Sequence, residues 1–294
     1  MTIRSLLNKG LLRLGIDLYP FLDRLYLPLD RKHILRTRNI RLIPGEADRR
    51  GGKHAYGEWA HVIGIFQTLM YLNLARKENN QILDVGCGTG LLAIAGEPFL
   101  GEEGKYTGID VMRPDIEFCR SHYPAERYEF IHFDVANPTY APEQKGARLP
   151  WPVASDSIDL LTALSVWTHL AEEDALFYFR EISRVLRPGG RAIVTFFLLD
   201  EAYRESLGRR SEQEGRFHMT SQNLWIFNQP TYGSDAWFHL EWIPVPEDAI
   251  GVTEQGLDRL CAHAGLEVIA RHQGNWKEIP GIFFQDVLIF RKAE

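Results

Sequence analysis

Residues 82–90, with the sequence ILDVGCGTG, constrain the fold of this chain more than any other stretch. A short apolar run leads into three glycines, and a helix-like segment follows Gly90. A glycine-rich turn between a strand and a helix directs backbone N–H groups toward a ligand at the positive end of the helix. The stretch therefore predicts an α/β fold that binds a nucleotide.

Strand-like and helix-like segments alternate after this turn, which favours a parallel sheet with right-handed crossovers. The expected strands are residues 81–85, 106–109, 129–133, 158–164 and 191–197, with helices over 91–100, 113–123 and 171–186. Pro188, Gly189 and Gly190 are expected to end the third of these helices. A helix over 253–264 and strands over 266–272 and 283–291 close the chain, and the short link 274–281 suits an antiparallel hairpin.

Two regions lie outside this alternation. Residues 1–77 are predicted to form a helical arm and lid: Leu7, Leu11, Leu14 and Leu18 recur at helical spacing, and a second helix is expected over 58–76. Residues 198–250 form a long aromatic insertion without a clear period. Such a loop often makes a lid or a binding region.

The acids around the glycine loop narrow the ligand. A dinucleotide fingerprint requires glycine at position 91, where this chain has Leu91. Asp84 precedes the loop and suits a cationic group better than a diphosphate. Asp110 ends the next strand, where an acid accepts hydrogen bonds from ribose hydroxyls. Asp134 follows the third strand, within reach of an adenine amino group. S-adenosylmethionine has a cationic end, a ribose and an adenine without phosphate, and it fits this pattern.

The chain resembles the class I S-adenosylmethionine-dependent methyltransferases over residues 78–200 and the closing strands. Five ordered motifs carry the resemblance: ILDVGCGTG, YTGIDV, FIHFDVAN, IDLLTALSVWTHL and ISRVLRPGGRAIVTFF. It implies a Rossmann-like sheet of seven mostly parallel strands with an antiparallel last strand. Residues 78–294 are then the methyltransferase domain, with an insertion after the fifth strand.

The resemblance also implies roles for individual residues. The loop of Gly86, Cys87, Gly88 and Gly90 lines the methionine moiety, and Asp84 orients its amino group. Asp110 holds the ribose and Asp134 faces the adenine. Val111, Met112 and Val135 flank the adenine ring, and Leu164 and Ser165 close the site beneath the sulfonium.

The acceptor side is less determined by the sequence. His169 is the leading candidate for a general base, because an imidazole exchanges protons near neutral pH. A purely structural role for His169 is the alternative. Tyr56 and Trp59 of the lid, Trp167 beside His169, and Tyr232 and His239 of the insertion are candidate acceptor contacts. For the insertion, a core or homo-oligomer contact is the alternative to an acceptor site.

These features predict an enzyme that methylates a small molecule, most favourably on oxygen, such as a sugar, a glycolipid or another secondary metabolite. N-methylation of a small molecule and a dinucleotide-dependent oxidoreductase are the alternatives. The Asn-Pro-Pro-Tyr and Asp-Pro-Pro-Tyr signatures of amide-nitrogen methyltransferases are absent, and the ten histidines show no metal-ligand spacing. A scaffold that binds the cofactor at a membrane without turnover is a third class.

Charge and cysteine content bear on partners and location. Residues 1–53 carry 12 Lys or Arg and 5 Asp or Glu, whereas the whole chain has a net charge of −6. This basic arm either packs on the acidic body or contacts an anionic membrane or a phosphorylated substrate. The acidic body and the lack of a nucleic-acid motif argue against nucleic acid. The three cysteines are scattered, and no apolar run reaches the roughly 18 residues that span a bilayer. These two observations predict a cytoplasmic protein. Membrane association through the basic arm is left as an option.

Overall fold

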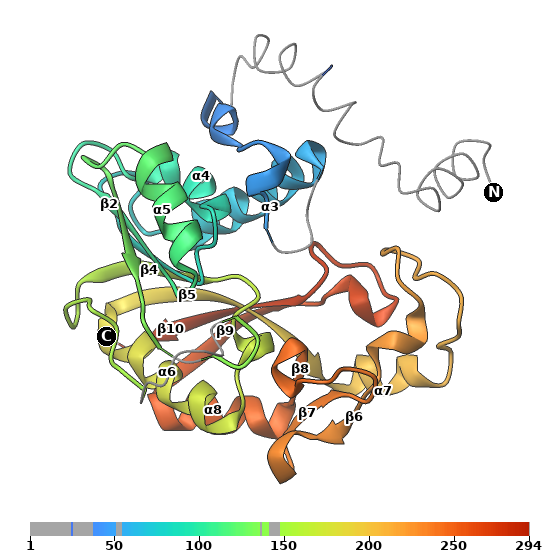
Figure 1. The fold of residues 1–294 in the computed structure, drawn as a ribbon. Helices are drawn as coiled ribbons and strands as arrows, with labels where there is room; N and C mark the ends of the chain where they lie inside the picture. The colour runs from blue at the N-terminus through green and yellow to red at the C-terminus, as the bar shows by residue number, and fades with distance from the viewer. Residues whose placement is uncertain (1–24, 26–37, 51–54, 136, 141–147, 294) are drawn as a thin grey trace.

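A computed structural model describes residue 25 and residues 38–50, 55–135, 137–140 and 148–293. These residues form a twisted sheet of ten strands, with helices against both faces (Figure 1). The leucine-striped segment predicted as the first helix lies outside the described residues.

Seven strands make the central sheet, in the order β3-β2-β1-β4-β5-β10-β9. They are β1 Gln81–Val85, β2 Lys105–Asp110, β3 Tyr128–His132, β4 Ile158–Ala163, β5 Leu186–Leu199, β9 Leu266–His272 and β10 Asp286–Lys292. β10 runs antiparallel to both of its neighbours, while β1 to β5 are parallel. The predicted fold class is confirmed, as is the antiparallel pairing of the last two strands.

Two layers of helices cover the sheet because successive strand residues point to opposite faces. Ile82 packs with the layer of α3 Tyr56–Asn73, α4 Leu91–Gly96 and α5 Arg113–His122, and the neighbouring Leu83 packs with the layer of α6 Glu172–Val185 and α8 Glu254–Ala264. Short 3-10 helices connect these elements: η1 Arg38–Leu42, η2 Glu46–Asp48, η3 Glu97–Phe99, η4 Trp167–His169, η5 Gln222–Trp225, η6 Thr231–Gly233, η7 Pro246–Asp248 and η8 Asn275–Lys277.

The Pro-Gly-Gly stretch after α6 ends the helix and inserts a bulge into β5. Ile158 pairs with Leu186, and Leu160 pairs with Arg191, so the residues between Leu186 and Arg191 have few counterparts on β4. Gly189 has a φ of +74°, which glycine adopts with little strain. The strand consequently begins earlier than the sequence predicts and resumes its register at Arg191.

The insertion is a folded extension of the sheet, which corrects its prediction as an irregular loop. It contains α7 Glu201–Leu207 and three short strands, β6 Phe227–Pro230, β7 Trp237–Leu240 and β8 Ile250–Thr253. β8 pairs in parallel with the last residues of β5, and β7 and β6 follow in antiparallel order. Several of its aromatic side chains are core residues, since Phe227 and Trp237 are both buried.

Residues 38–50 pack beside the glycine loop. The Asn39 side chain donates to the Ile94 carbonyl at 2.5 Å, and His122 Nε2 lies 2.7 Å from the Leu42 carbonyl. Thr89 Oγ1 donates to the Asp48 carbonyl at 2.6 Å. This part of the predicted lid is therefore fixed to α4, α5 and the loop between β1 and α4.

Candidate functional site

The glycine loop joins β1 to α4 at the carboxyl edge of the sheet. Gly86 and Gly90 have φ values of +69° and +90°. A Cβ on Gly86 would lie 2.6 Å from Val166 Cγ2, and a Cβ on Gly90 would lie 2.6 Å from the Tyr123 hydroxyl. Glycine is required at both positions by conformation and by close approach, so the loop has a fixed shape before any ligand binds.

Asp110 fastens this loop to the end of β2. Its Oδ2 accepts from the Gly88 amide at 2.8 Å, and its Oδ1 accepts from the Met112 amide at 2.8 Å. Burial raises the pKa of this carboxyl group. A carboxylate has about four acceptor sites, so two amide contacts leave it capacity for the ribose hydroxyls that the sequence predicts.

Asp84 lies behind the loop and is only 1% exposed. Its carboxylate accepts hydrogen bonds from the Tyr106 hydroxyl and, at 2.7 Å, from Thr162 Oγ1. Burial raises the pKa of Asp84 to about 7. A cationic ligand beside this group would favour its ionised form, which agrees with the predicted place of a ligand amino group.

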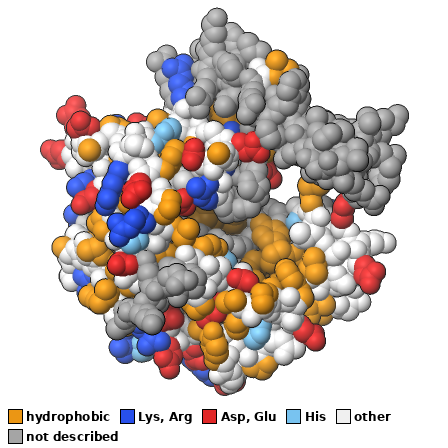
Figure 2. Space-filling model, viewed as in Figure 1, with side chains coloured by type: hydrophobic (Ala, Val, Ile, Leu, Met, Phe, Trp, Pro, Cys, Tyr) orange, Lys and Arg blue, Asp and Glu red, His pale blue; other side chains and the backbone are white. Residues whose placement is uncertain are grey.

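A cavity of about 960 Å³ opens at this edge of the sheet. Figure 2 shows hydrophobic side chains gathered around a hollow in this face of the molecule. The volume is near the upper end of the range of roughly 300–1,000 Å³ for ligand sites. Most predicted cofactor residues line the cavity: Asp84, Gly86, Cys87, Gly88, Asp110, Val111, Met112, Val135, Leu164 and Ser165. Among the predicted acceptor-side residues, Trp59, Trp167 and His169 line it too.

Two predicted cofactor residues lie outside the cavity wall. Asp134 is exposed, because the preceding Phe133 turns its ring into the core and the alternation directs Asp134 to solvent. Gly90 is buried against Tyr123 at the start of α4, where it shapes the loop.

Three predicted acceptor contacts also lie away from the cavity. Tyr56 begins α3, with the Arg49 guanidinium 5.9 Å from its ring. Tyr232 is 70% exposed on the insertion, and its hydroxyl donates to Glu247 Oε1 at 2.8 Å. His239 lies on β7, with Nδ1 3.1 Å from Thr231 Oγ1. Tyr232 lies on η6 and His239 on β7, and neither of these elements contributes to the cavity wall.

Trp167 has a mixed position. It contributes to the cavity wall, yet it is fully buried and packs edge-to-face on Phe179 with ring centroids 5.5 Å apart. Its indole N–H donates to the Ala175 carbonyl at 3.4 Å. Trp167 therefore anchors η4 to α6 and holds the neighbouring His169 in place.

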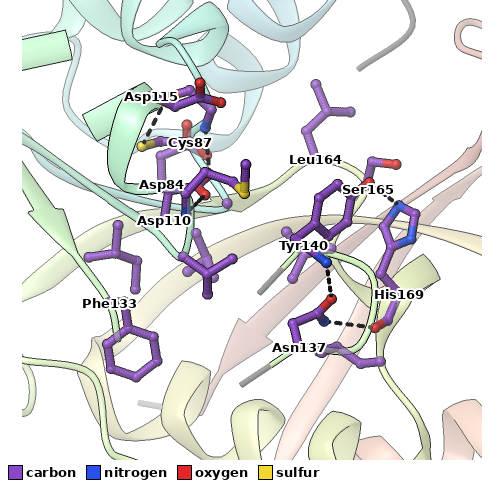
Figure 3. Close-up of a pocket in the computed structure, with 18 of the residues that line it drawn as sticks. Asp84, Cys87, Asp110, Asp115, Phe133, Asn137, Tyr140, Leu164, Ser165 and His169 are labelled. Carbon is purple, nitrogen blue, oxygen red and sulfur yellow. Dashed lines mark hydrogen bonds between the residues drawn. The ribbon is translucent and has the colours of Figure 1, made fainter. Parts of the chain in front are cut away.

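His169 is held in one tautomer by the insertion. Its Nδ1 lies 2.6 Å from the Glu247 carbonyl oxygen, which only accepts, so Nδ1 carries the proton. Nε2 is then an acceptor, and the Tyr140 hydroxyl lies 3.2 Å from it. Burial lowers the pKa of His169. The imidazole is consequently neutral near pH 7, and Figure 3 shows it beside Tyr140, whose hydroxyl lies at Nε2.

Sequence reasoning missed the residues that surround His169. Asn137 and Tyr140 line the cavity, and Figure 3 shows them beside His169. Asn137 Oδ1 accepts from the Tyr140 amide at 3.0 Å, and its Nδ2 donates to the His169 carbonyl at 3.4 Å. The Asn137-Pro138 pair is a turn signal, but nothing in the sequence connects this turn to η4.

Arg50 is a second residue that the sequence did not assign to the site. It lines the cavity, and its Nε donates to Asp115 Oδ1 at 3.0 Å. Asp115 is in the first turn of α5 and is 4% exposed. This ion pair attaches the segment before α3 to the first turn of α5.

The fold and this site together define a Rossmann-like protein with a phosphate-free nucleoside site at the carboxyl edge of its strands. Residues 83–194 match the family described as "Methyltransferase domain". Methyltransferase GfsG from Streptomyces halstedii is 32% identical over 126 residues, which are 42% of this chain and 40% of that protein. The 27-O-demethylrifamycin SV methyltransferase of Amycolatopsis mediterranei is 31% identical over 127 residues, or 43% and 42% of the two chains.

A solved structure agrees with the fold. The putative S-adenosylmethionine-dependent methyltransferase from Listeria monocytogenes aligns with a TM-score of 0.50 at 12% identity, over 79% of this chain and 99% of that one. The chain carries a methyltransferase domain over residues 83–194, which supports the predicted class I S-adenosylmethionine-dependent methyltransferase. It spans less than half the length of the curated relatives named above.

The residues of the cavity fit the cofactor of this family. Asp84 offers a buried carboxylate for a cationic group, Asp110 offers acceptors for a ribose, and the loop backbone approaches closely at Gly86. Leu91 leaves the loop without the third glycine of a diphosphate site. Within the described residues, no helix is both long and apolar enough to span a bilayer.

Proposed function

We propose that this chain is an S-adenosylmethionine-dependent methyltransferase that transfers a methyl group to a hydroxyl oxygen of a small molecule. The observation that carries the oxygen assignment is the state of His169. Its Nδ1–H is committed to the Glu247 carbonyl, so Nε2 is a hydrogen-bond acceptor at the cavity wall. A neutral imidazole in this position suits removal of a hydroxyl proton.

When bound, S-adenosylmethionine supplies a methyl group on a sulfonium centre, whose sulfur is already a good leaving group. The task of the protein is then to position the acceptor and to receive its proton. Asp84 would hold the amino group of the cofactor and Asp110 its ribose, and the acceptor hydroxyl would take the place of the Tyr140 hydroxyl at Nε2 of His169. General-base assistance of this type contributes about 10²–10⁴-fold to a rate.

Relatives give this proposal support. The O-methyltransferase of Pyrenophora dematioidea is 33% identical over 135 residues, which cover 46% of each chain. The aligned residues make up less than half of either protein. The acceptor half of this chain, including Glu247 and the insertion, has to be judged from its own residues.

Thermal unfolding with S-adenosylhomocysteine and, separately, with NAD tests the cofactor. A ligand present at 100 times its Kd stabilises the native state by about 2.7 kcal/mol. We expect stabilisation by S-adenosylhomocysteine alone, and stabilisation by NAD alone would exclude the proposal. Transfer of a tritiated methyl group to mixed alcohols, phenols and amines then identifies the atom, since label found only on nitrogen would replace O-methylation by N-methylation.

A further inference from the structure

Ser165 lines the cavity in an uncommon backbone conformation. It lies between β4 and η4, and its φ is +62°. Residues other than glycine seldom adopt this region, and those that the surrounding structure holds there cluster at functional sites. In this conformation the Ser165 amide donates to Thr195 Oγ1 at 2.7 Å. The backbone of Ser165 is therefore fixed to β5.

The Thr195 hydroxyl sets the orientation of the Gln285 side chain. Thr195 is fully buried and its oxygen already accepts from the Ser165 amide, so its own proton requires an acceptor. Gln285 Oε1 lies 2.6 Å away and takes that proton. The amide nitrogen of Gln285 then faces Ser165, and Nε2 donates to Ser165 Oγ at 2.8 Å. Ser165 Oγ is consequently the acceptor in this contact.

The proton of the Ser165 hydroxyl is left available to a ligand. Thr168 is fully buried, and its hydroxyl lies 3.3 Å from Ser165 Oγ. Because a buried hydroxyl has to donate its proton, we assign Thr168 as the donor and Ser165 Oγ as the acceptor. Gln285 and Thr168 thus both donate to Ser165, whose own proton is directed into the cavity that it lines. Two donated hydrogen bonds also polarise this hydroxyl and strengthen it as a donor.

This donor and the acceptor nitrogen of His169 belong to one short turn. His169 follows Ser165 by four positions, and its amide donates to the Val166 carbonyl at 2.9 Å. Figure 3 shows Ser165, Tyr140 and His169 on the same side of the pocket. Nε2 of His169 is an acceptor, whereas Ser165 Oγ is a donor. The turn therefore presents two complementary hydrogen-bonding groups to the cavity.

We propose that Ser165 is a specificity-determining residue whose hydroxyl donates to a second oxygen of the acceptor molecule, beside the hydroxyl that His169 deprotonates. The acceptor is then a molecule with an ether, carbonyl or hydroxyl oxygen next to the methylated hydroxyl. A lone hydroxyl on a hydrocarbon would leave the Ser165 donor without a partner, which weakens binding. This inference rests on the proposed function, because it takes His169 as the base. Gln285 is a positioning residue that acts through Ser165.

Titration calorimetry of the full chain saturated with S-adenosylhomocysteine tests the proposal with two isosteric phenols. 2-Methoxyphenol has an ether oxygen beside its hydroxyl, and 2-ethylphenol has a methylene in its place. The Kd of 2-ethylphenol divided by that of 2-methoxyphenol measures the contribution of this oxygen. We expect Ser165→Ala to lower this Kd ratio by about threefold or more, through loss of one hydrogen bond. An unchanged Kd ratio, or no binding of 2-methoxyphenol to the wild type, would overturn the proposal.

Gln285→Glu tests the direction of the hydrogen bonds while the Ser165 hydroxyl is kept. A carboxylate only accepts, so the Ser165 proton should turn toward residue 285 and away from the cavity. The Kd ratio is expected to fall as in Ser165→Ala, and an unchanged Kd ratio contradicts the assigned directions. Ser121→Ala is the matched control, since Ser121 is exposed on α5 outside the cavity wall, and it should keep the wild-type Kd ratio.

The same titrations separate an acceptor contact from a cofactor contact and from a failed cofactor site. If the Ser165 hydroxyl serves the cofactor instead, Ser165→Ala weakens S-adenosylhomocysteine and leaves the Kd ratio unchanged, and the proposal fails. If S-adenosylhomocysteine does not bind the wild type, the proposed function fails by itself. The Kd ratio is then measured without cofactor and still decides the role of Ser165. Thermal unfolding checks that each variant is folded, and Gln285→Glu carries the test if Ser165→Ala is not.

Discussion

Asp84 connects cofactor binding to pH. Its pKa in the folded protein, raised by burial to about 7, exceeds the ordinary value of 3.8. Between these two pH values the folded state consequently binds more protons than the unfolded state, so the free energy of unfolding falls as pH rises from about 3.8 to about 7 and levels off above that. A ligand ammonium group favours the ionised form. We expect the affinity for S-adenosylhomocysteine to rise about tenfold between about pH 6 and 8.

Titration calorimetry across this pH range measures the effect. 5′-Methylthioadenosine, which lacks the amino acid portion, is the control ligand and should bind with little pH dependence. Asp84→Asn should remove the dependence for S-adenosylhomocysteine, because the amide does not ionise. If the affinity of Asp84→Asn for S-adenosylhomocysteine still depends on pH, the titrating group is a different one.

His169 predicts the acid limb of the pH–rate profile. A base works only when neutral, and burial lowers the pKa of this imidazole from its ordinary value of 6.5. Activity should therefore fall with a midpoint below pH 6.5, and His169→Gln should reduce kcat by about 10²-fold or more. Rates are measured with an acceptor found by the tritium assay. His239→Gln is the control, because His239 lies outside the cavity wall. This variant should keep the wild-type rate and the same fall of activity at acidic pH.

At the scale of elements, Lys277 ties η8 to two strands. Its Nζ lies 2.8 Å from Asp200 Oδ2, just after β5, and 2.7 Å from Asp286 Oδ1, the first residue of β10. Lys277→Met would leave these carboxylates without their cation in a buried setting. Such a loss costs about 3–5 kcal/mol of unfolding free energy.

Urea unfolding measures this cost, with Lys105→Met as the control. Lys105 forms an ion pair with Glu129 at 2.7 Å, and both side chains are more than 40% exposed. Exposed pairs contribute less than about 1 kcal/mol. If the two variants lose similar stability, Lys277 does not hold the hairpin in place.

The elements also show where sequence patterns stop being informative. β1 and the helix ends around Pro188 follow from hydrophobic runs and turn residues, which act over a few positions. β6, β7 and β8 have four residues each, too few for alternation to be recognised. The contact that fixes His169 joins it to Glu247, which is 78 residues later in the chain. The cofactor half is local in sequence and was predictable, whereas the acceptor half is assembled by long-range contacts.

At the scale of the whole molecule, segments that are far apart in the sequence meet at one edge of the sheet and form the cavity there. Arg50 reaches Asp115 from the segment before α3, and Tyr140 reaches His169 from the loop after β3. Thr139 Oγ1 donates to Asp248 Oδ1 at 3.0 Å, which joins that loop to the insertion. The proposed cofactor site and the proposed base are thereby joined by one continuous set of contacts.

The uneven charge of the whole chain predicts how it responds to an anionic surface. Residues 1–53 have an excess of seven positive charges, on a chain of net charge −6. Each Lys or Arg near an anionic bilayer contributes about 1 kcal/mol. If the basic arm contacts membranes, replacing Arg4, Lys9 and Arg13 with Gln should weaken binding to vesicles containing phosphatidylglycerol by about a hundredfold at low salt.

Vesicle co-sedimentation of the full chain provides the measurement. A triple substitution of Arg76, Lys105 and Arg291 with Gln removes the same charge from exposed positions outside the arm and should leave binding nearly intact. Binding should also decline with added salt, because exposed charges are screened beyond about 10 Å at 0.1 M. Wild-type protein that stays in the supernatant at low salt would contradict membrane contact and would favour packing of the basic arm on the acidic remainder of the chain.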